Sequence, residues 1–210
     1  MVNGRTGKVT RDKPGEWKWK DLGVDIAVET TGTIKDRAGL AQHLACGAKK
    51  VIMSAPAKDA DVTIVMGVNQ NMYDPARHDV LSAASCTTNC LAPMAHFLNQ
   101  LSPIDKGFMT TIHAYTNDQN TLDGPHAKGD LRRARTAAAN IIPTTTGAAS
   151  AIGLVIPELD GKLDGTSQRV PVITGSLTEL TAVVRDNLSV EQINQYMQKS
   201  VSPSYGYTEE

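Results

Sequence analysis

The most constraining feature of the sequence is residues 81–101, where an apolar run meets a helical pattern. The run ends at Ser85, and apolar residues then recur at helical spacing from Leu91 to Leu98. Ser85 is a natural N-cap at this junction, which places Cys86 in the first helical turn. A helix N-terminus offers free backbone N–H groups and a positive partial charge, and both stabilise a thiolate. The stretch therefore predicts a strand–turn–helix junction with a nucleophilic thiol. On this stretch alone, a small apolar cysteine packed in a helix is an equally good interpretation.

The composition narrows the classes of partner. The 210 residues carry a net charge of −1, which gives no argument for nucleic acid or an acidic membrane surface. No apolar run approaches the length of a membrane span, and no secretory signal is recognisable. Cys86 and Cys90 lie one helical turn apart but lack the further soft ligands of a zinc site, so we expect no metal. Free thiols in a reducing cytoplasm are the better interpretation.

The first part of the chain is predicted to form a parallel sheet. Short apolar runs typical of buried strands recur there, and one stretch between them has helical spacing. The expected strands are residues 24–29, 50–53, 62–66 and 79–83, and the expected helix is residues 34–46. Alternation of this kind indicates a βαβ arrangement. Asn3 and Gly4 also predict a hairpin turn, with residues 8–10 as its second strand.

The pattern changes after Leu101, where an α+β arrangement is expected. The expected strands are residues 108–115, 170–173 and 177–185, and the expected helices are residues 147–154 and 190–197. Residues 117–139 form a long polar and basic loop, and such a loop in a compact domain is usually functional. We therefore place a domain boundary near Ser85.

The residues around the thiol predict chemistry on a small anionic substrate. His113, on a predicted strand after the helix, is the best candidate to activate Cys86, although a lone strand histidine is more often a satisfied structural residue. Arginines of the long loop and Arg169 suit a phosphate group. The N–H groups after Thr146 can also bind an anion, although each feature taken singly is more simply a solvated face or a helix cap. Together they indicate a thiol enzyme that acts on a small phosphorylated acyl or carbonyl compound.

A long motif points further. Residues 84–93, with the sequence Ala-Ser-Cys-Thr-Thr-Asn-Cys-Leu-Ala-Pro, closely resemble the active-site signature of phosphorylating glyceraldehyde-3-phosphate dehydrogenases. Residues 111–119, 131–135, 140–144 and 165–171 resemble further motifs of that family in the same order. The resemblance covers essentially the whole chain. It implies an α/β plus α+β fold: an incomplete Rossmann-type NAD-binding domain at residues 1–85, followed by a mixed or antiparallel-sheet catalytic domain at residues 86–210.

The resemblance also implies residue roles. Cys86 is the nucleophile that forms a hemithioacetal and then a thioester, and His113 is the general base and acid. The positions that match the site of the attacking phosphate are Ser85, Thr87, Thr146 and Gly147. The positions that match the surroundings of the substrate phosphate, and its exchange between two anion sites, are Thr116, Asp118, Arg132 and Arg169. The positions that match residues lining the dinucleotide are Arg11, Gly32 and Ser54, and the cofactor implied is NAD.

The activity implied is NAD-dependent oxidation and phosphorylation of D-glyceraldehyde 3-phosphate to 1,3-bisphosphoglycerate in cytoplasmic glycolysis, by a homotetramer. The chain departs from the family in three places. The Gly-rich phosphate turn at the start and the C-terminal elements are missing, and residues 125–130 carry extra residues ahead of Arg132. We therefore expect an internal fragment that by itself binds NAD poorly and is inactive.

Three alternatives stay open at this point. The first is the related erythrose-4-phosphate dehydrogenase, against which Thr116 argues. The second is a Cys–His hydrolase or acyl transferase that turns over without NAD, for which no third residue is evident to orient His113. The third is a non-catalytic binding role on the cell surface.

Overall fold

The computed structural model describes residues 3–207. Contacts divide the chain into two compact units. Unit 1 comprises Met1–Thr63 and Tyr73–Ala83, and unit 2 comprises Ile64–Met72 and Ala84–Glu210. The domain assignment predicted from the sequence, with its boundary at residue 85, stays a prediction.

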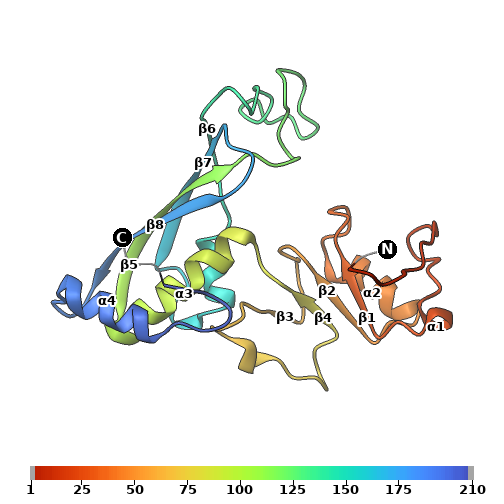
Figure 1. Cartoon of the computed structure of the whole chain (residues 1–210), viewed down its shortest axis with the longest axis horizontal. Helices are drawn as coiled ribbons and strands as arrows, with labels where there is room; N and C mark the ends of the chain where they lie inside the picture. The colour runs from red at the N-terminus through yellow and green to blue at the C-terminus, as the bar shows by residue number, and fades with distance from the viewer. Residues whose placement is uncertain (1–2, 208–210) are drawn as a thin grey trace. The chain divides into compact units, whose positions relative to one another are not determined.

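Unit 1 is a parallel sheet with the strand order β1-β2-β4-β3. Its strands are β1 (Ile26–Glu29), β2 (Lys50–Met53), β3 (Val62–Thr63) and β4 (Val80–Ser82), and its helices are α1 (Trp19–Leu22) and α2 (Arg37–Ala45) (Figure 1). Asp36 caps α2 by accepting a hydrogen bond from the backbone of Gly39 at 2.7 Å. Leu40 of α2 packs with Val51 of β2 and Val80 of β4 in the core of the unit. The expected parallel sheet is confirmed.

A polar cluster is buried within the same unit. The Glu29 carboxylate accepts hydrogen bonds from the backbone and the hydroxyl of Thr31, at 2.6 and 2.5 Å. His43 Nε2 lies 3.1 Å from Glu29 Oε2, and Trp19 Nε1 donates to His43 Nδ1 at 3.0 Å. Trp17 stacks on the imidazole with ring centroids 3.9 Å apart. Glu29 and His43 are only 2% and 5% exposed, so this cluster ties the end of β1 to α2.

Unit 2 is built on a mixed sheet with the strand order β6-β7-β5-β8. Its strands are β5 (Ile104–Ala114), β6 (Ile142–Thr144), β7 (Leu163–Val170) and β8 (Ser176–Val184), and its helical segments are η1 (Gln70–Met72), α3 (Cys86–Leu101), η2 (Ser150–Leu154), η3 (Pro157–Leu159) and α4 (Val190–Lys199). β5 and β7 are parallel, and the other two pairs are antiparallel. The long loop runs from β5 to β6 beyond one end of this sheet (Figure 1). The expected mixed α/β fold class is confirmed.

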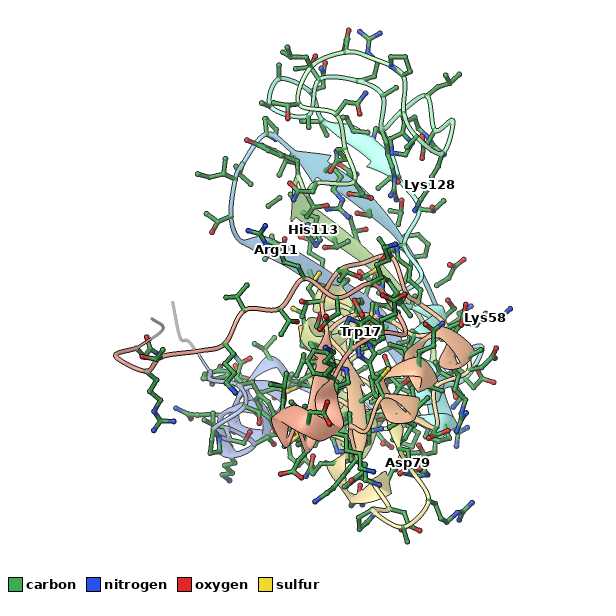
Figure 2. The ribbon with its side chains drawn as sticks, turned by 90° about the vertical axis from the view of Figure 1, so that its right-hand side faces the viewer. Arg11, Trp17, Lys58, Asp79, His113 and Lys128 are labelled. Carbon is green, nitrogen blue, oxygen red and sulfur yellow. The ribbon has the colours of Figure 1, made fainter. Side chains whose placement is uncertain are left out.

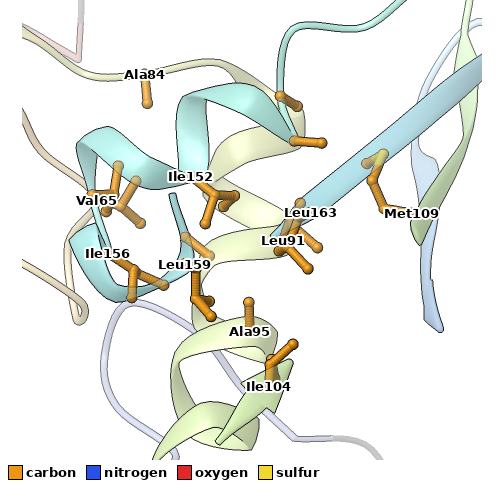
Figure 3. Close-up of a cluster of buried hydrophobic side chains, with 14 residues drawn as sticks. Val65, Ala84, Leu91, Ala95, Ile104, Met109, Ile152, Ile156, Leu159 and Leu163 are labelled. Carbon is orange, nitrogen blue, oxygen red and sulfur yellow. The ribbon is translucent and has the colours of Figure 1, made fainter. Parts of the chain in front are cut away.

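The core of unit 2 forms between α3, the sheet and η2–η3. Leu91 and Ala95 of α3 are fully buried against Met109 of β5 and Ile152 of η2 (Figure 3). This packing accounts for the apolar spacing seen in the sequence of α3. It fixes α3 against β5, the two elements that carry the predicted nucleophile and base.

Some local predictions were wrong. Residues 8–10 form no strand in the structure. A strand was expected at residues 170–173, but β7 covers Leu163–Val170. β7 is polar and contains Gly165, where a Cβ would overlap the side chain of Met109. Close approach to β5 therefore selects glycine here, and the periodicity of apolar residues does not reveal the strand.

Within the described residues, none of the helices has the length and apolar character required to cross a membrane.

Candidate active site

The N-terminus of α3 positions the candidate nucleophile. Ser85 is the N-cap, and its hydroxyl accepts a hydrogen bond from the backbone of Thr88 at 2.9 Å. Cys86 is the first residue of this 16-residue helix and is exposed. Ala84, just before the cap, has a φ of 59°, a strained conformation for a residue with a Cβ. The free N–H groups of the first turn and the positive end of the helix dipole therefore lie at the Cys86 thiol.

His113 of β5 faces this thiol. Its Nε2 atom lies 3.2 Å from Cys86 Sγ, and its Nδ1 atom lies 2.7 Å from the carbonyl oxygen of Ala114. A carbonyl only accepts hydrogen bonds, so Nδ1 carries the proton and Nε2 is free to take one from the thiol. The structure therefore brings Cys86 and His113 together in the geometry of an activated thiol.

Arg169 of β7 completes the neighbourhood of the histidine. Its Nη1 atom donates to the carbonyl of Ala114 and to the hydroxyl of Thr116, both at 3.0 Å. The same atom lies 3.2 Å from His113 Nδ1, but both atoms are donors, so the shared Ala114 carbonyl is what holds them together. Burial lowers the pKa of Arg169, and the charge of Arg133 acts in the same direction. The guanidinium still remains a cation at neutral pH.

Asp118, in the loop after β5, lies near two arginines, Arg133 of the same loop and Arg169 of β7. It accepts a hydrogen bond from the Thr116 hydroxyl at 2.5 Å and forms an ion pair with Arg133. Burial acts to raise the pKa of Asp118, but the Thr116 hydrogen bond and the charges of Arg133 and Arg169 outweigh it, so the pKa is lowered. Arg133 also donates to the Thr144 hydroxyl of β6 from Nε at 3.1 Å and from Nη2 at 3.0 Å. The loop is thereby fastened to the sheet.

The sequence analysis named Arg132 for the anion site, whereas the structure places the side chain of its neighbour, Arg133, against Asp118. Arg132 is exposed, and its backbone N–H donates a hydrogen bond to the Asp130 carboxylate at 3.0 Å. The Arg133 side chain, 19% exposed, is the one that reaches Asp118. Sequence reasoning missed this role because three similar arginines occur within four positions, and only the tertiary contacts distinguish them.

A cavity of about 400 Å³ opens beside the thiol. It is lined by Cys86, Thr87, His113 and Thr116, together with residues 173–175 between β7 and β8 and Ser176 at the start of β8. The residues of the β7–β8 connection and Thr111, whose buried hydroxyl has no partner among the described residues, were not anticipated. A larger cavity of about 690 Å³ between α3, α4 and β8 has mainly apolar side chains in its lining. The smaller cavity is the one that contains Cys86 and His113.

Three further residues were predicted to bind an anion, namely Thr87 in α3 and Thr146 and Gly147 ahead of η2. Thr87 is buried beside Cys86 in α3. The Thr146 hydroxyl accepts a hydrogen bond from the backbone of Ala148 at 3.2 Å, and Gly147 is exposed ahead of η2. Neither Thr146 nor Gly147 is among the residues that line the cavity at the thiol. Their role in binding phosphate stays a prediction.

The three residues predicted to line the dinucleotide all lie in unit 1. Gly32 and Ser54 are exposed and follow β1 and β2, which are neighbouring parallel strands. Ser54 donates from its backbone to the carbonyl of Glu29 at 3.1 Å. The carboxyl ends of parallel strands are where nucleotides bind in open sheets, so these two positions fit part of a dinucleotide site. Arg11 lies on an exposed segment outside helices and strands.

Cys90 lies one helical turn after Cys86 in α3. It is exposed and lines both cavities. Within residues 3–207, no cluster of three or more potential ligands suitable for a metal ion is present.

Comparison with known proteins agrees with this geometry. The profile of the family described as glyceraldehyde 3-phosphate dehydrogenase, C-terminal domain, matches residues 85–209. The chain is 56% identical over 211 residues to the glyceraldehyde-3-phosphate dehydrogenase of Clostridium pasteurianum, an alignment that covers all of this chain and 63% of the relative. This chain belongs to the glyceraldehyde-3-phosphate dehydrogenase family.

Other glyceraldehyde-3-phosphate dehydrogenases give the same result. The enzyme of Streptomyces coelicolor is 56% identical over 200 residues, which cover 95% of this chain and 59% of the relative. Glyceraldehyde-3-phosphate dehydrogenase 1 of Bacillus subtilis is 52% identical over 215 residues, with 100% of this chain and 64% of the relative covered. The chain thus spans less than two thirds of the length of these relatives.

Proposed function

We propose that these residues belong to an NAD-dependent, phosphorylating glyceraldehyde-3-phosphate dehydrogenase of glycolysis. The enzyme would convert D-glyceraldehyde 3-phosphate and inorganic phosphate to 1,3-bisphosphoglycerate. The observation that supports this best is the 3.2 Å contact between Cys86 Sγ and His113 Nε2 beside the Arg169 guanidinium. Family membership adds weight, because the relatives are named for this activity.

The chain's own groups suit each chemical task. The Cys86 thiolate would add to the aldehyde carbon to form a hemithioacetal, with the new oxyanion near the N–H groups of the α3 N-terminus. His113 Nε2 would protonate that oxyanion and later take back the hydroxyl proton as the thioester forms. Bound NAD would supply the hydride acceptor. Phosphate would then attack the thioester carbon and release the Cys86 thiolate.

Anion binding falls to the residues around Arg169. The substrate phosphate would use Arg169 and Thr116, since Thr116 lines the cavity and its hydroxyl is hydrogen-bonded to Arg169 Nη1. Arg133 takes the place of Arg132 in this proposal, because its side chain reaches the same network. The proposed ligands of inorganic phosphate remain Ser85, Thr87, Thr146 and Gly147. The proposed ligands of NAD remain Gly32, Ser54 and Arg11. We further propose a cytoplasmic homotetramer.

The test uses the complete protein and two serine variants. Cys86→Ser should abolish NADH formation that depends on both glyceraldehyde 3-phosphate and phosphate, whereas Cys90→Ser should retain it. Arg133→Ala should raise the phosphate concentration needed for half-maximal rate, and Arg132→Ala should change it less than about twofold. Absence of phosphate-dependent NADH formation in the unsubstituted protein would contradict the proposal. A higher rate with erythrose 4-phosphate, or turnover without NAD, would favour the two enzymatic alternatives.

A further inference from the structure

We propose that Asp118 is a resident anion, which links Arg169 to Arg133 through Thr116 and competes with phosphate groups for these cations. This inference rests on the proposed function, because it concerns the same anion site. It changes the role of Asp118, which the family resemblance places among the residues that surround the substrate phosphate. A carboxylate cannot itself attract a phosphate group, so its position between two arginines requires another explanation.

The hydrogen bonds form one continuous chain. Arg169 Nη1 donates to Thr116 Oγ1 at 3.0 Å, and Thr116 Oγ1 donates to Asp118 Oδ1 at 2.5 Å. The other carboxylate oxygen, Oδ2, forms the ion pair with Arg133. Arg133 in turn reaches Thr144 of β6. Asp118 is therefore the acceptor on which donors from both directions converge.

The Thr116 hydroxyl has a single proton, so it can donate a hydrogen bond to only one acceptor at a time. Arg169 and Arg133 carry no acceptor, so each can only donate. With Arg169 donating to the hydroxyl, its one proton is given to Asp118. An incoming phosphate that uses Thr116 as a donor must therefore take this proton away from the carboxylate. Asp118 thus occupies with its own charge the donors that a phosphate would recruit.

The site keeps unused donors for a stronger anion. Arg169 Nε is buried and has no hydrogen-bond partner among the described residues. The same is true of Nε2 of Gln119, whose Oε1 accepts a hydrogen bond from the backbone of Thr116 at 3.3 Å. Asp118 offers one negative charge to two guanidinium groups, so a net positive charge remains. A phosphate dianion can therefore still bind, but against the charge of the resident carboxylate.

The decisive experiment measures the affinity of the chain for inorganic phosphate and sulfate. Asp118→Asn keeps the shape of the side chain and removes its charge. Phosphate binding, followed by calorimetry or phosphorus NMR at low ionic strength, should tighten on the order of five- to tenfold. If Asp118 only braced the loop, the same substitution would weaken binding by releasing Arg133. The direction of the change therefore separates the two roles.

Asp123→Asn is the matched control. Asp123 lies in the same loop and pairs with Arg135 at 3.1 Å, with both side chains more than half exposed. The substitution makes the same change in net charge, but it should alter phosphate affinity by less than about twofold. A tightening of equal size in both variants would show a general charge effect and overturn the inference.

A second measurement does not depend on phosphate binding. Alkylation of Cys86 by the anion iodoacetate, relative to neutral iodoacetamide, reports the local potential and can be followed by peptide mass spectrometry. This ratio should rise in Asp118→Asn and stay constant in Asp123→Asn. If the asparagine variant fails to fold by circular dichroism, Asp118→Ser replaces it in both measurements.

The outcomes separate the inference from the function on which it rests. If Arg169→Ala leaves phosphate binding unchanged, the proposed phosphate site is wrong, and the resident anion falls with it. If Arg169→Ala weakens binding while Asp118→Asn does not tighten it, the resident anion alone is overturned. Tighter binding together with a raised alkylation ratio supports the inference.

Discussion

His113 in unit 2 and His43 in unit 1 are the same side chain in two opposite settings. Both are buried, at 8% and 5% exposure. In His43, Nδ1 contacts the indole N–H of Trp19 and Nε2 contacts the carboxylate of Glu29, so both ring nitrogens have structural partners. In His113, one nitrogen is held by the Ala114 carbonyl and the other meets the Cys86 thiol at an open cavity. Figure 2 shows His113 among the side chains of the second sheet.

The difference shows what makes a histidine chemically available. Trp19 donates to His43 Nδ1, so the proton of the neutral ring sits on Nε2 and points at the Glu29 carboxylate. Adding a second proton would place it on Nδ1, against the indole N–H. His113 has its proton on the far nitrogen, and its free nitrogen faces a thiol that can lose one. Burial is therefore a poor guide to function here, and the partner of the second nitrogen decides it.

The largest expected effect comes from removing the reactive histidine. His113→Asn should lower NADH formation by the complete protein about 10²–10⁴-fold, because general acid–base catalysis is lost. His43→Asn is the paired control and should leave the alkylation rate of Cys86 unchanged. Equal losses of thiol reactivity in both variants would break the distinction between the two histidines.

The next effect is on the stability of unit 1. Glu29→Ala should lower the free energy of unfolding by about 3 kcal/mol, because the buried His43 ring and the two Thr31 donors lose their acceptor. Both tryptophans of the chain lie in unit 1, so their fluorescence during urea unfolding reports this unit selectively. Cys86 alkylation should not change. A loss below about 1 kcal/mol would mean that the cluster contributes little.

The same carboxylate predicts a dependence on pH. Burial acts to raise the pKa of Glu29, but the Thr31 hydrogen bonds and His43 outweigh it, so the folded pKa is lowered. A lowered folded pKa contributes stability that is present above the unfolded pKa, about 4.3, and is lost as pH falls through the folded value. Unfolding followed by tryptophan fluorescence should therefore become easier below about pH 4.3. Glu29→Gln should flatten this dependence, and an unchanged acid profile would contradict the assignment.

Local patterns in the sequence predicted the parts of the structure that depend on neighbours along the chain. The cap at Ser85, helix α3 and the position of Cys86 follow from spacing over a few residues, and β2 matches its expected bounds. β7 could not be predicted, because its polar side chains and Gly165 are explained only by the strands on either side of it.

The choice of Arg133 over Arg132 likewise depends on contacts with Asp118 and Thr144, which are distant in sequence. The same is true of His43, whose helix alone gave no indication of a role. Its partners Glu29 and Trp19 lie 14 and 24 positions away. Helical spacing and strand patterns therefore do not identify the partners of Arg133 and His43, which depend on contacts across the fold.

The smallest expected effect tests how firmly His43 is held. Trp19→Phe removes the N–H that donates to His43 Nδ1, keeps an aromatic ring, and should cost about 1 kcal/mol of unfolding free energy, because one buried acceptor loses its partner. Trp17→Phe is the matched variant, since Trp17 stacks on the imidazole at 3.9 Å and no hydrogen bond from its indole N–H to His43 accompanies that contact. It should cost less than Trp19→Phe. Urea unfolding followed by the remaining tryptophan measures both, and the reverse order would show that stacking, rather than the hydrogen bond, keeps this histidine in its structural role.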